Sequence, residues 1–443
     1  MVRPPYPIAI LGAGKIGAAI ALLLQRGGDY DILVADQDPA RLQAVARLGC
    51  RTAQVRDDDA LQQAVSGRYA VLNALPFHRA RAAAAACVRA GAHYFDLTED
   101  VASTHAIREL AASAGTVLMP QCGLAPGFIG VVGSDLSRRF DRLLDLRMRV
   151  GALPRFPSNA LRYNLTWSTE GLINEYCNAC EAIVDGALVA VPPMEGYETF
   201  TLDGIEYEAF NTSGGLGTLP QTLLGKARNV DYKSIRYPGH CAIMKLLLND
   251  LRLRERRDLL QEILESAIPS TDQDVIVILA SASGYRQQRL VQESFSARIY
   301  GATVDGQTLS AIQLSTAAGI CTMLDLAVHG HLLQRGFIGQ EQVPLAALLD
   351  NRYGRIYAAS RCRRGRRRRR CCPGPRPNPP GATSRAPGAA LPVRSRPGSG
   401  ARCPHGRGRP GAPARARAPA RQGTGARAAG RCGACAARGG RDC

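Results

Sequence analysis

The sequence is poor in aromatic residues, with a single tryptophan, and it contains no run of about 20 uncharged apolar residues. The second absence argues against a membrane-spanning helix, so we expect no association with a membrane. No signal peptide is expected either, because Met1 is followed almost at once by a strand-like apolar run. These absences predict a cytoplasmic protein.

The C-terminal segment lacks almost every large apolar side chain. Residues 361–443 contain no Lys, Ile, Met, Phe, Tyr or Trp, but they contain 22 Arg. Such a segment cannot bury a core, so we expect a disordered basic tail. Its Arg, Ala, Gly, Pro and Cys are the residues that GC-rich codons encode in an arbitrary frame, and we favour a frameshift near residue 360 as its origin. The alternative is an Arg-rich arm that contacts nucleic acid nonspecifically.

Outside this tail the chain is nearly neutral. Residues 1–360 carry 34 basic and 36 acidic side chains, although the net charge of the whole chain is +19. This balance excludes a globally basic nucleic-acid-binding protein. Seven of the 14 cysteines are scattered through the same region, an odd number that is typical of reduced thiols in a reducing compartment.

Strands and helices are predicted to alternate regularly over residues 7–119. Short apolar runs, the first at residues 7–11, are separated by helical patterns such as residues 15–25. Regular alternation with short connections predicts an α/β fold with a doubly wound parallel sheet. After Gly127 the pattern changes to period-two strands interleaved with helices, which is typical of an α+β domain.

A glycine-rich turn follows the first predicted strand and opens the first predicted helix. It fits the pattern G-x-G-x-x-G with the residues Gly12, Ala13, Gly14, Lys15, Ile16 and Gly17. Glycines at these positions permit a tight turn, close approach of a pyrophosphate and packing of the helix on the sheet. Asp36 ends the second strand, where a carboxylate accepts hydrogen bonds from the adenosine ribose and repels a 2′-phosphate. The sequence therefore predicts a Rossmann domain that binds NAD in preference to NADP; the alternative is a similar domain without a cofactor.

These patterns divide the chain into domains. The Rossmann domain is expected at residues 1–126, and an α+β domain for substrate binding and dimerisation at residues 127–309. A long apolar helix at about residues 310–333 is expected to return to the Rossmann domain, and residues 334–360 to end the fold. We expect a homodimer.

Two more loops follow strands of the parallel sheet, at the edge that faces a cofactor crevice. The loop Ala74-Leu75-Pro76 follows the fourth strand and is a candidate to contact the cofactor, with an ordinary strand-to-helix turn as an equal alternative. Asp96 and Glu99 follow the fifth strand and are candidates for recognising a substrate amine or exchanging a proton, with Thr98 as a substrate contact. For Asp100 a role as a helix cap is an equal alternative.

Polar residues also gather in the second domain. Tyr163 and Trp167 lie in one polar run and are candidates for substrate binding. Arg236 and His240 lie in another, residues 232–240, between predicted elements. The planar guanidinium of Arg236 suits a carboxylate, and His240 is either a proton-transfer group or a structural histidine.

No metal site is expected. Cys177-x-x-Cys180 lacks a second pair at zinc spacing, and His329-x-His331 lies on an apparent packing helix. No catalytic triad built on Ser or Cys is readable either.

Together these segments resemble the saccharopine dehydrogenase family, which includes saccharopine reductases and lysine 6-dehydrogenases. The resemblance covers about residues 7–357. Its most specific pieces are Gly123-Leu124-Ala125-Pro126-Gly127, Tyr163–Ser168 with Glu170-Gly171-Leu172, Thr212-Ser213-Gly214-Gly215 and Tyr232–His240. Ala125 stands where fungal saccharopine reductases tend to have an acidic residue, so this chain looks more like the lysine 6-dehydrogenase branch.

The resemblance implies NAD(P)-dependent hydride transfer from a carbon that bears an amine, followed by hydrolysis of the imine. The implied substrate is saccharopine or lysine, with L-lysine 6-dehydrogenase and carboxynorspermidine dehydrogenase-like activities as alternatives. In this interpretation Arg236 binds the substrate carboxylate, Asp96 and Glu99 recognise the amine, and His240 transfers a proton. A dinucleotide-binding protein without turnover is a second alternative, which the polar density at residues 232–240 disfavours.

Overall fold

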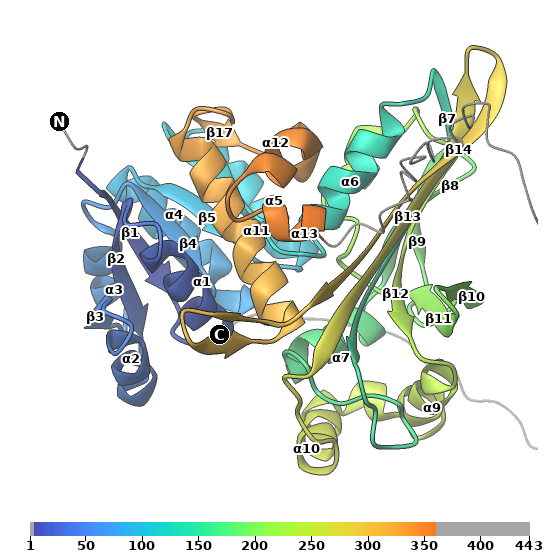
Figure 1. Cartoon of the computed structure of the whole chain (residues 1–443), viewed down its shortest axis with the longest axis horizontal. Helices are drawn as coiled ribbons and strands as arrows, with labels where there is room; N and C mark the ends of the chain where they lie inside the picture. Colours follow the sequence, from blue (N-terminus) through green and yellow to red (C-terminus); the bar gives the residue numbers. More distant parts are fainter. Residues whose placement is uncertain (1–3, 360–443) are drawn as a thin grey trace, which may run out of the picture. The chain divides into compact units, whose positions relative to one another are not determined.

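Seven parallel strands form the first sheet, in the order β17-β6-β5-β4-β1-β2-β3 (Figure 1). The computed structural model describes residues 4–359. The strand order is that of a doubly wound dinucleotide-binding domain, so the predicted fold class is confirmed. The strands are β1 Tyr6–Leu11, β2 Tyr30–Asp36, β3 Arg51–Gln54, β4 Ala70–Asn73, β5 His93–Asp96, β6 Val117–Met119 and β17 Gly336–Phe337. The helices between β1 and β6 are α1 Lys15–Gln25, α2 Pro39–Ala46, α3 Asp58–Val65, a 3₁₀ turn Phe77–Arg79, α4 Ala80–Ala90 and α5 Val101–Ala111.

Alternate residues of β1 face opposite layers of helices. Ile8 and Ile10 are buried with residues of α1 and of helix α11 (Ala311–Val328), whereas Ala9 and Leu11 are buried with residues of α3, α4 and α5. Successive side chains of a strand point to opposite faces, so both faces of this sheet are covered. Only the edges of the sheet where strands end remain open to a ligand.

The second sheet is mixed and joins β10-β11-β12-β7-β13-β14, with β8 paired to β12 and to β9. Strands β7 and β12 are parallel, and the other pairs of this sheet are antiparallel. Its strands are β7 Arg142–Pro154, β8 Cys180–Val184, β9 Ala187–Val191, β10 Glu198–Leu202, β11 Ile205–Asn211, β12 Asn229–Arg236, β13 Asp274–Arg286 and β14 Arg289–Tyr300. The helices around it are α6 Phe128–Ser137, α7 Thr169–Cys177, α8 Leu219–Leu223, α9 His240–Lys245, a π-helical turn Leu246–Asp250, a 3₁₀ turn Leu253–Glu255 and α10 Arg257–Ala267.

Strand β12 overlaps the polar segment 232–240, which the sequence places between predicted elements. Tyr232, Ser234 and Arg236 all line one cavity, while Ile235 packs into a small core on the opposite side. Because the cavity side of this strand is polar, the segment lacks the apolar alternation that usually marks a half-buried strand.

The long helix α11 returns to the first domain and packs against α1. It ends at Val328, earlier than the expected residue 333, because Gly330 adopts a φ of +73° just beyond it. By length and apolar composition alone α11 could cross a membrane, but 78% of it is buried within the described structure. A core helix meets the same criteria, so α11 is weak evidence for a membrane span.

The remaining elements follow β14 in the chain. They are the hairpin β15 Ala302–Val304 and β16 Gln307–Leu309, a 3₁₀ turn Gln340–Gln342, α12 Leu345–Asp350 and α13 Arg355–Ala359. In α13, Tyr357 is fully buried, stacks on Phe128 with ring centroids 3.8 Å apart, and donates to the carbonyl oxygen of Ser315 at 2.6 Å. The fold therefore uses the chain at least to residue 357. The tail expected at residues 361–443 lies outside the described residues.

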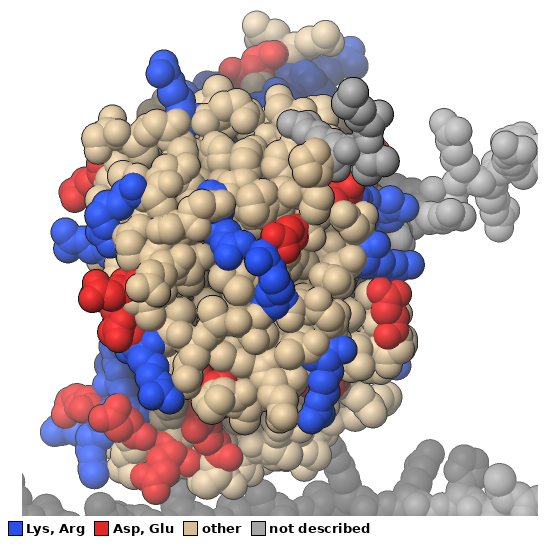
Figure 2. All heavy atoms as spheres, turned by 90° about the vertical axis from the view of Figure 1, so that its left-hand side faces the viewer, with Lys and Arg blue, Asp and Glu red and all other residues tan. Residues whose placement is uncertain are grey.

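Charges of both signs are interspersed on the face of the molecule that Figure 2 shows. This distribution agrees with the near neutrality of residues 1–360. A stripe of one sign, the usual footprint of nucleic-acid binding, is not seen among the described residues on this face.

Candidate functional site

A cavity of about 1340 Å³ is lined by residues of both domains. Its first wall consists of the glycine-rich turn and the loops that follow β2, β4 and β5. Its second wall includes residues of β7, β12, α7, α10 and α11 and of the segment before α7, and the loop after β6 also lines the cavity. Pockets for a single small molecule usually measure roughly 300–1,000 Å³, so this cavity has room for a dinucleotide beside a small substrate.

Each glycine of the turn meets a different steric requirement. Gly12 has a φ of +99°, and a Cβ there would lie 2.9 Å from the carbonyl oxygen of Ala74. A Cβ on Gly17 would lie 1.8 Å from the carbonyl oxygen of Gly12, so a larger residue would force α1 away from the turn. A Cβ on Gly14 would meet no atom within 4 Å. This open space at the N-terminus of α1 fits a pyrophosphate, which the helix dipole stabilises.

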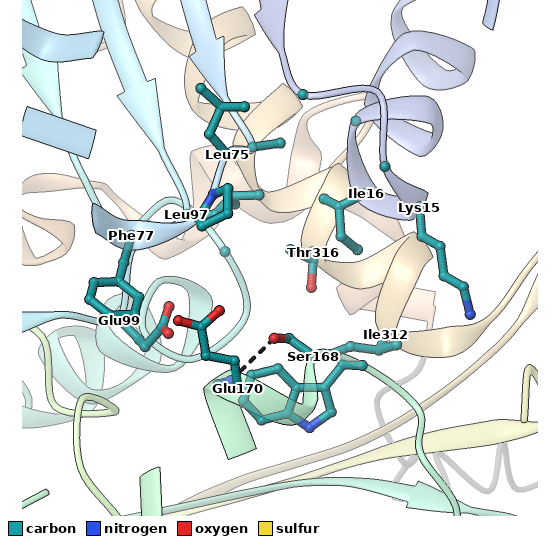
Figure 3. A pocket seen from close by; sticks show the side chains of 18 of the residues that line it. Lys15, Ile16, Leu75, Phe77, Leu97, Glu99, Ser168, Glu170, Ile312 and Thr316 are labelled. Atoms are coloured by element: carbon teal, nitrogen blue, oxygen red, sulfur yellow. Dashed lines mark hydrogen bonds between the residues drawn. The ribbon is translucent and has the colours of Figure 1, made fainter. Parts of the chain in front are cut away.

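Asp36 is buried at the end of β2 and is tied to the glycine-rich turn. Its Oδ2 accepts a hydrogen bond from the Ala13 N–H at 2.6 Å, and its Oδ1 accepts one from the Asp38 N–H at 2.9 Å. Lys15 and Ile16 line the same cavity (Figure 3). The residues predicted to bind a dinucleotide therefore lie on one wall.

The loop Ala74-Leu75-Pro76 also lies on this wall. It is shaped by Asn73, whose side-chain oxygen accepts from the Leu75 N–H at 3.1 Å and whose amide donates to the Tyr94 hydroxyl at 3.0 Å. The buried amide thus connects the ends of β4 and β5.

Asp96 holds neighbouring loops together and does not reach the cavity lining. Its Oδ1 accepts from the N–H groups of Thr98 and Gln121 at 3.0 and 2.9 Å, and its Oδ2 accepts from the Tyr94 hydroxyl at 2.9 Å. Burial raises the pKa of Asp96 to about 6, and the hydrogen bonds limit the rise. The prediction that Asp96 recognises a substrate amine does not fit this placement, because its oxygens are occupied inside the protein.

Glu99, from the same loop, does reach the cavity, and so does Thr98. Figure 3 shows the carboxylates of Glu99 and Glu170 turned towards each other. Burial, reinforced by the negative charges of Asp100 and Glu170, raises the pKa of Glu99 to about 7. A carboxylate with such a pKa can exchange a proton near neutral pH. Asp100 itself caps α5, accepting from the Ser103 N–H at 2.7 Å.

Arg236 lies at the end of β12 with 2% of its surface exposed. Its Nε donates to the Tyr176 hydroxyl at 2.7 Å, and its Cζ lies 5.3 Å from the ring centroid of Tyr163. Its Nη2 lies 3.9 Å from Oε2 of Glu175. Burial raises the pKa of Glu175 to about 8, although the positive charge of Arg236 opposes the rise. The planar guanidinium therefore lies in the cavity lining, where its geometry suits a carboxylate, with Glu175 as an acidic neighbour.

His240 is fully buried and is not among the lining residues. Its Nδ1 lies 2.9 Å from the carbonyl oxygen of Leu161, which can only accept, so Nδ1 carries the hydrogen. Its Nε2 then accepts from the Tyr176 hydroxyl at 3.0 Å, and that hydroxyl accepts from Arg236. Burial, and after it the charge of Arg236, lowers the pKa of His240 to about 3. The prediction of direct proton transfer by His240 is not supported by this position; the neutral ring instead orients Tyr176 and Arg236.

Tyr163 and Trp167 have different surroundings. Trp167 lines the cavity and packs so closely on Gly171 that a Cβ there would lie 2.4 Å from the indole. Tyr163 is buried beside Arg236 and is not among the lining residues. Of the two predicted substrate contacts, only Trp167 is placed to touch a ligand directly.

Several residues of the second wall are not marked as functional by the sequence. Glu170, in the first turn of α7, appeared there only within a motif of the family resemblance. Glu175 and Tyr176 lie in the same helix among apolar residues, so nothing local distinguishes them from core positions. Their partner Arg236 lies some 60 positions away in the chain, and such a pairing leaves no local pattern in the sequence.

Within residues 4–359 no group of three His, Cys, Asp or Glu side chains is placed to hold a metal ion. The seven cysteines of this range are free thiols and buried. Burial raises the pKa of both Cys177 and Cys180, which disfavours thiolate chemistry at this pair.

Two domain models of one family match the chain. The saccharopine dehydrogenase NADP binding domain matches residues 8–119, and the saccharopine dehydrogenase C-terminal domain matches residues 123–352. The chain belongs to the saccharopine dehydrogenase family. The two matches together include every residue that lines the cavity.

Individual relatives are distant. A mitochondrial alpha-aminoadipic semialdehyde synthase of Rattus norvegicus is 21% identical over 220 residues, which is 44% of this chain and 23% of the relative. A saccharopine dehydrogenase (NADP(+), L-glutamate-forming) of Schizosaccharomyces pombe is 20% identical over 255 residues, 53% of this chain and 57% of the relative. The matched region thus covers less than two thirds of the length of each of these two relatives. The solved saccharopine dehydrogenase of Saccharomyces cerevisiae shares the fold, with a TM-score of 0.65, 16% identity and coverage of 77% of this chain and 95% of that one.

These relatives also bear on the cofactor. The matched N-terminal domain is described as NADP-binding, and the fission-yeast relative is described as an NADP(+) enzyme. They support a nicotinamide dinucleotide as cofactor of this family member. They favour NADP over the NAD that Asp36 predicts.

The glycine-rich turn provides a matched pair of substitutions. Gly17→Ala should destabilise the protein by about 2 kcal/mol or more, because its Cβ overlaps the backbone of Gly12. Gly14→Ala should leave the melting temperature unchanged and weaken dinucleotide binding about tenfold, because its Cβ occupies only the open space. Thermal unfolding and dinucleotide titration of both variants test this; a stable Gly17→Ala variant, or full affinity in Gly14→Ala, would contradict it.

Proposed function

We propose that this protein is a nicotinamide-dinucleotide-dependent oxidoreductase that acts on the carbon–nitrogen bond of an amino acid related to lysine or saccharopine. The observation that carries the proposal is the pairing, in one cavity, of a dinucleotide-binding turn with Glu99 and Arg236. A protein that only sensed the dinucleotide would not need the second, charged wall. The family and the dehydrogenase names of the relatives agree with this chemistry.

The bound dinucleotide supplies a hydride acceptor. The residues of the chain bind and orient the substrate and accept its proton. Arg236 binds the substrate carboxylate through its guanidinium, which Tyr176 and His240 hold in position. Glu99 accepts the proton that the substrate nitrogen loses as the carbon–nitrogen double bond forms. Water then adds to this bond and releases the amine and the carbonyl product.

Three side chains bear on the choice between NAD and NADP. The carboxylate of Asp36 opposes a 2′-phosphate, whereas the exposed guanidiniums of Arg41 and Arg56 line the same part of the cavity and attract one. The preference follows from the balance between these charges.

Asp36→Ser should raise the affinity for NADP relative to NAD by about tenfold, because it removes the charge that repels the 2′-phosphate. The ratio is the informative quantity, since the lost hydrogen bond to Ala13 weakens both complexes. Binding titrations with both dinucleotides measure it. Arg56→Ala serves as the opposite control and should lower the affinity for NADP alone; equal changes for both dinucleotides in Asp36→Ser would contradict this role of Asp36.

Oxidation of the amine requires the ionised form of Glu99, which predominates above its pKa. The value of kcat/KM with a turned-over substrate should therefore rise with pH through about 7 and level off above it. Glu99→Gln should lower kcat by roughly 10²–10⁴-fold and remove this limb of the profile. Reduction of the dinucleotide, followed by absorbance with lysine, saccharopine or a carboxylated polyamine as separate substrates, provides the measurement.

The control for Glu99→Gln is Glu109→Gln, which makes the same change on the exposed face of α5. It should leave the profile unchanged. If Glu99→Gln keeps the limb near pH 7, the proton acceptor is another group. If none of the three substrates supports reduction of either dinucleotide, the proposed function is wrong.

A further inference from the structure

The three nitrogens of the Arg236 guanidinium have different surroundings. Nε donates to the Tyr176 hydroxyl at 2.7 Å, and Nη1 donates to the carbonyl oxygen of Ile235 at 2.8 Å. Nη2 lies 3.9 Å from Oε2 of Glu175, which is too long for a hydrogen bond. The contact between Arg236 and Glu175 is therefore one of charge, at the nitrogen that is left for a ligand.

Both groups line the cavity although they are nearly closed to solvent. Arg236 is 2% exposed and Glu175 is 9% exposed. A buried charge is favourable only when a partner balances it, and one negative charge balances one guanidinium. An ionised Glu175 provides that charge from within the chain, whereas a ligand carboxylate provides it from outside. The two carboxylates are thus alternatives.

A carboxylate that binds Nη2 must come close to Glu175. An oxygen at a normal hydrogen-bond length of about 2.9 Å from Nη2 lies no more than about 7 Å from Oε2 of Glu175. Like charges at this separation repel in a buried site, and a carboxyl group relieves the repulsion by binding a proton. Binding of a ligand carboxylate is therefore coupled to protonation of Glu175.

The groups around Glu175 allow it to exchange a proton at mildly alkaline pH. Burial raises its pKa to about 8; Arg236 and the hydroxyl of Ser234 oppose the rise, and the charge of Glu99 adds to it. The other titratable side chains that interact with Glu175 are neutral in this range, because burial raises the pKa of each of them: Tyr163, Tyr176, Cys180 and Tyr232.

We propose that Glu175 is an internal competitor of the substrate carboxylate, so that Arg236 accepts this carboxylate while Glu175 holds a proton, and ionisation of Glu175 opposes the binding. This inference rests on the proposed function, in which Arg236 binds the substrate carboxylate, and it adds a second residue to that step. Glu175 takes no part in the hydride transfer. It acts through Arg236 as a positioning residue, and the proton that it takes up comes from solvent.

The coupling has a definite sign. Below about pH 8 most Glu175 is protonated, so a ligand carboxylate meets a neutral neighbour. Above that pH Glu175 is ionised, and binding requires one proton from solvent. The affinity for a carboxylate should therefore fall about tenfold for each pH unit above about 8. This loss ends the plateau of kcat/KM that the ionisation of Glu99 produces.

The test measures binding of hexanoate, which has one carboxylate and no group that titrates between about pH 6 and 10. Trp167 is the single tryptophan of the chain and lines the cavity, so its fluorescence reports binding. With the full chain saturated with oxidised dinucleotide, the dissociation constant should rise about tenfold between about pH 8.5 and 9.5. Calorimetry at about pH 9, in two buffers with different enthalpies of ionisation, should show uptake of about one proton.

Glu175→Gln keeps the size of the side chain but cannot ionise. It should bind hexanoate equally well at about pH 8.5 and 9.5, and at least about tenfold more tightly than the unaltered protein at the higher pH. Glu265→Gln makes the same change at an exposed position of the cavity lining on α10 and should keep the alkaline loss of affinity. Glu99→Gln should keep it with an onset at slightly lower pH, because the charge of Glu99 helps to raise the pKa of Glu175.

Two results would overturn the inference: an alkaline loss of affinity that persists in Glu175→Gln, or no such loss and no proton uptake in the unaltered protein. Failure of hexanoate to bind at any pH would overturn it as well, because Arg236 would then not be a site for a carboxylate. The proposed function is judged separately, by reduction of a dinucleotide with the substrates named above. It stands if only the alkaline loss is absent.

Discussion

The buried carboxylate of Asp96 is the group on which the geometry of the first wall depends. It accepts hydrogen bonds from Tyr94 and from the loops after β5 and β6, and Tyr94 in turn accepts from Asn73 at the end of β4. Three neighbouring strand ends are thereby held in one arrangement. Without these bonds the N–H groups of two loops would be buried and unpaired, at a cost of roughly 1–3 kcal/mol each. The position of Glu99 in the cavity follows from this anchoring.

The second wall also depends on buried hydrogen bonds, which here orient a positively charged side chain. Arg236 is nearly inaccessible to solvent, and it keeps its orientation because Tyr176, His240 and the carbonyl group of Leu161 form one directed chain of hydrogen bonds behind it. Every group in that chain except Arg236 is neutral. These neutral groups fix the orientation of the guanidinium without adding to the negative charge that Glu175 places near it.

The features that the sequence predicts well are local. The turn from Gly12 to Gly17 and the carboxylate of Asp36 are recognisable because spacing alone places them at the end of parallel strands, and the structure brings them together. The residue types of Asp96 and His240 suit catalysis, but the structure places both outside the cavity lining with their hydrogen bonds made inside the protein, and sequence does not reveal such burial. Strand β12 and its partners on α7 could not be predicted, since their pairing joins segments about 60 residues apart.

The cations and the carboxylates that line the cavity have different electrostatic functions. Phosphate groups need cations and helix N-termini, and these come from the segment between β1 and α4, which includes the start of α1. A substrate that loses a hydride becomes more positive at the reacting carbon, and carboxylates such as those of Glu99 and Glu170 stabilise that change. Glu99 comes from the first wall and Glu170 from the second, so the charge that favours chemistry at the carbon–nitrogen bond arises only because residues distant in the sequence share one cavity.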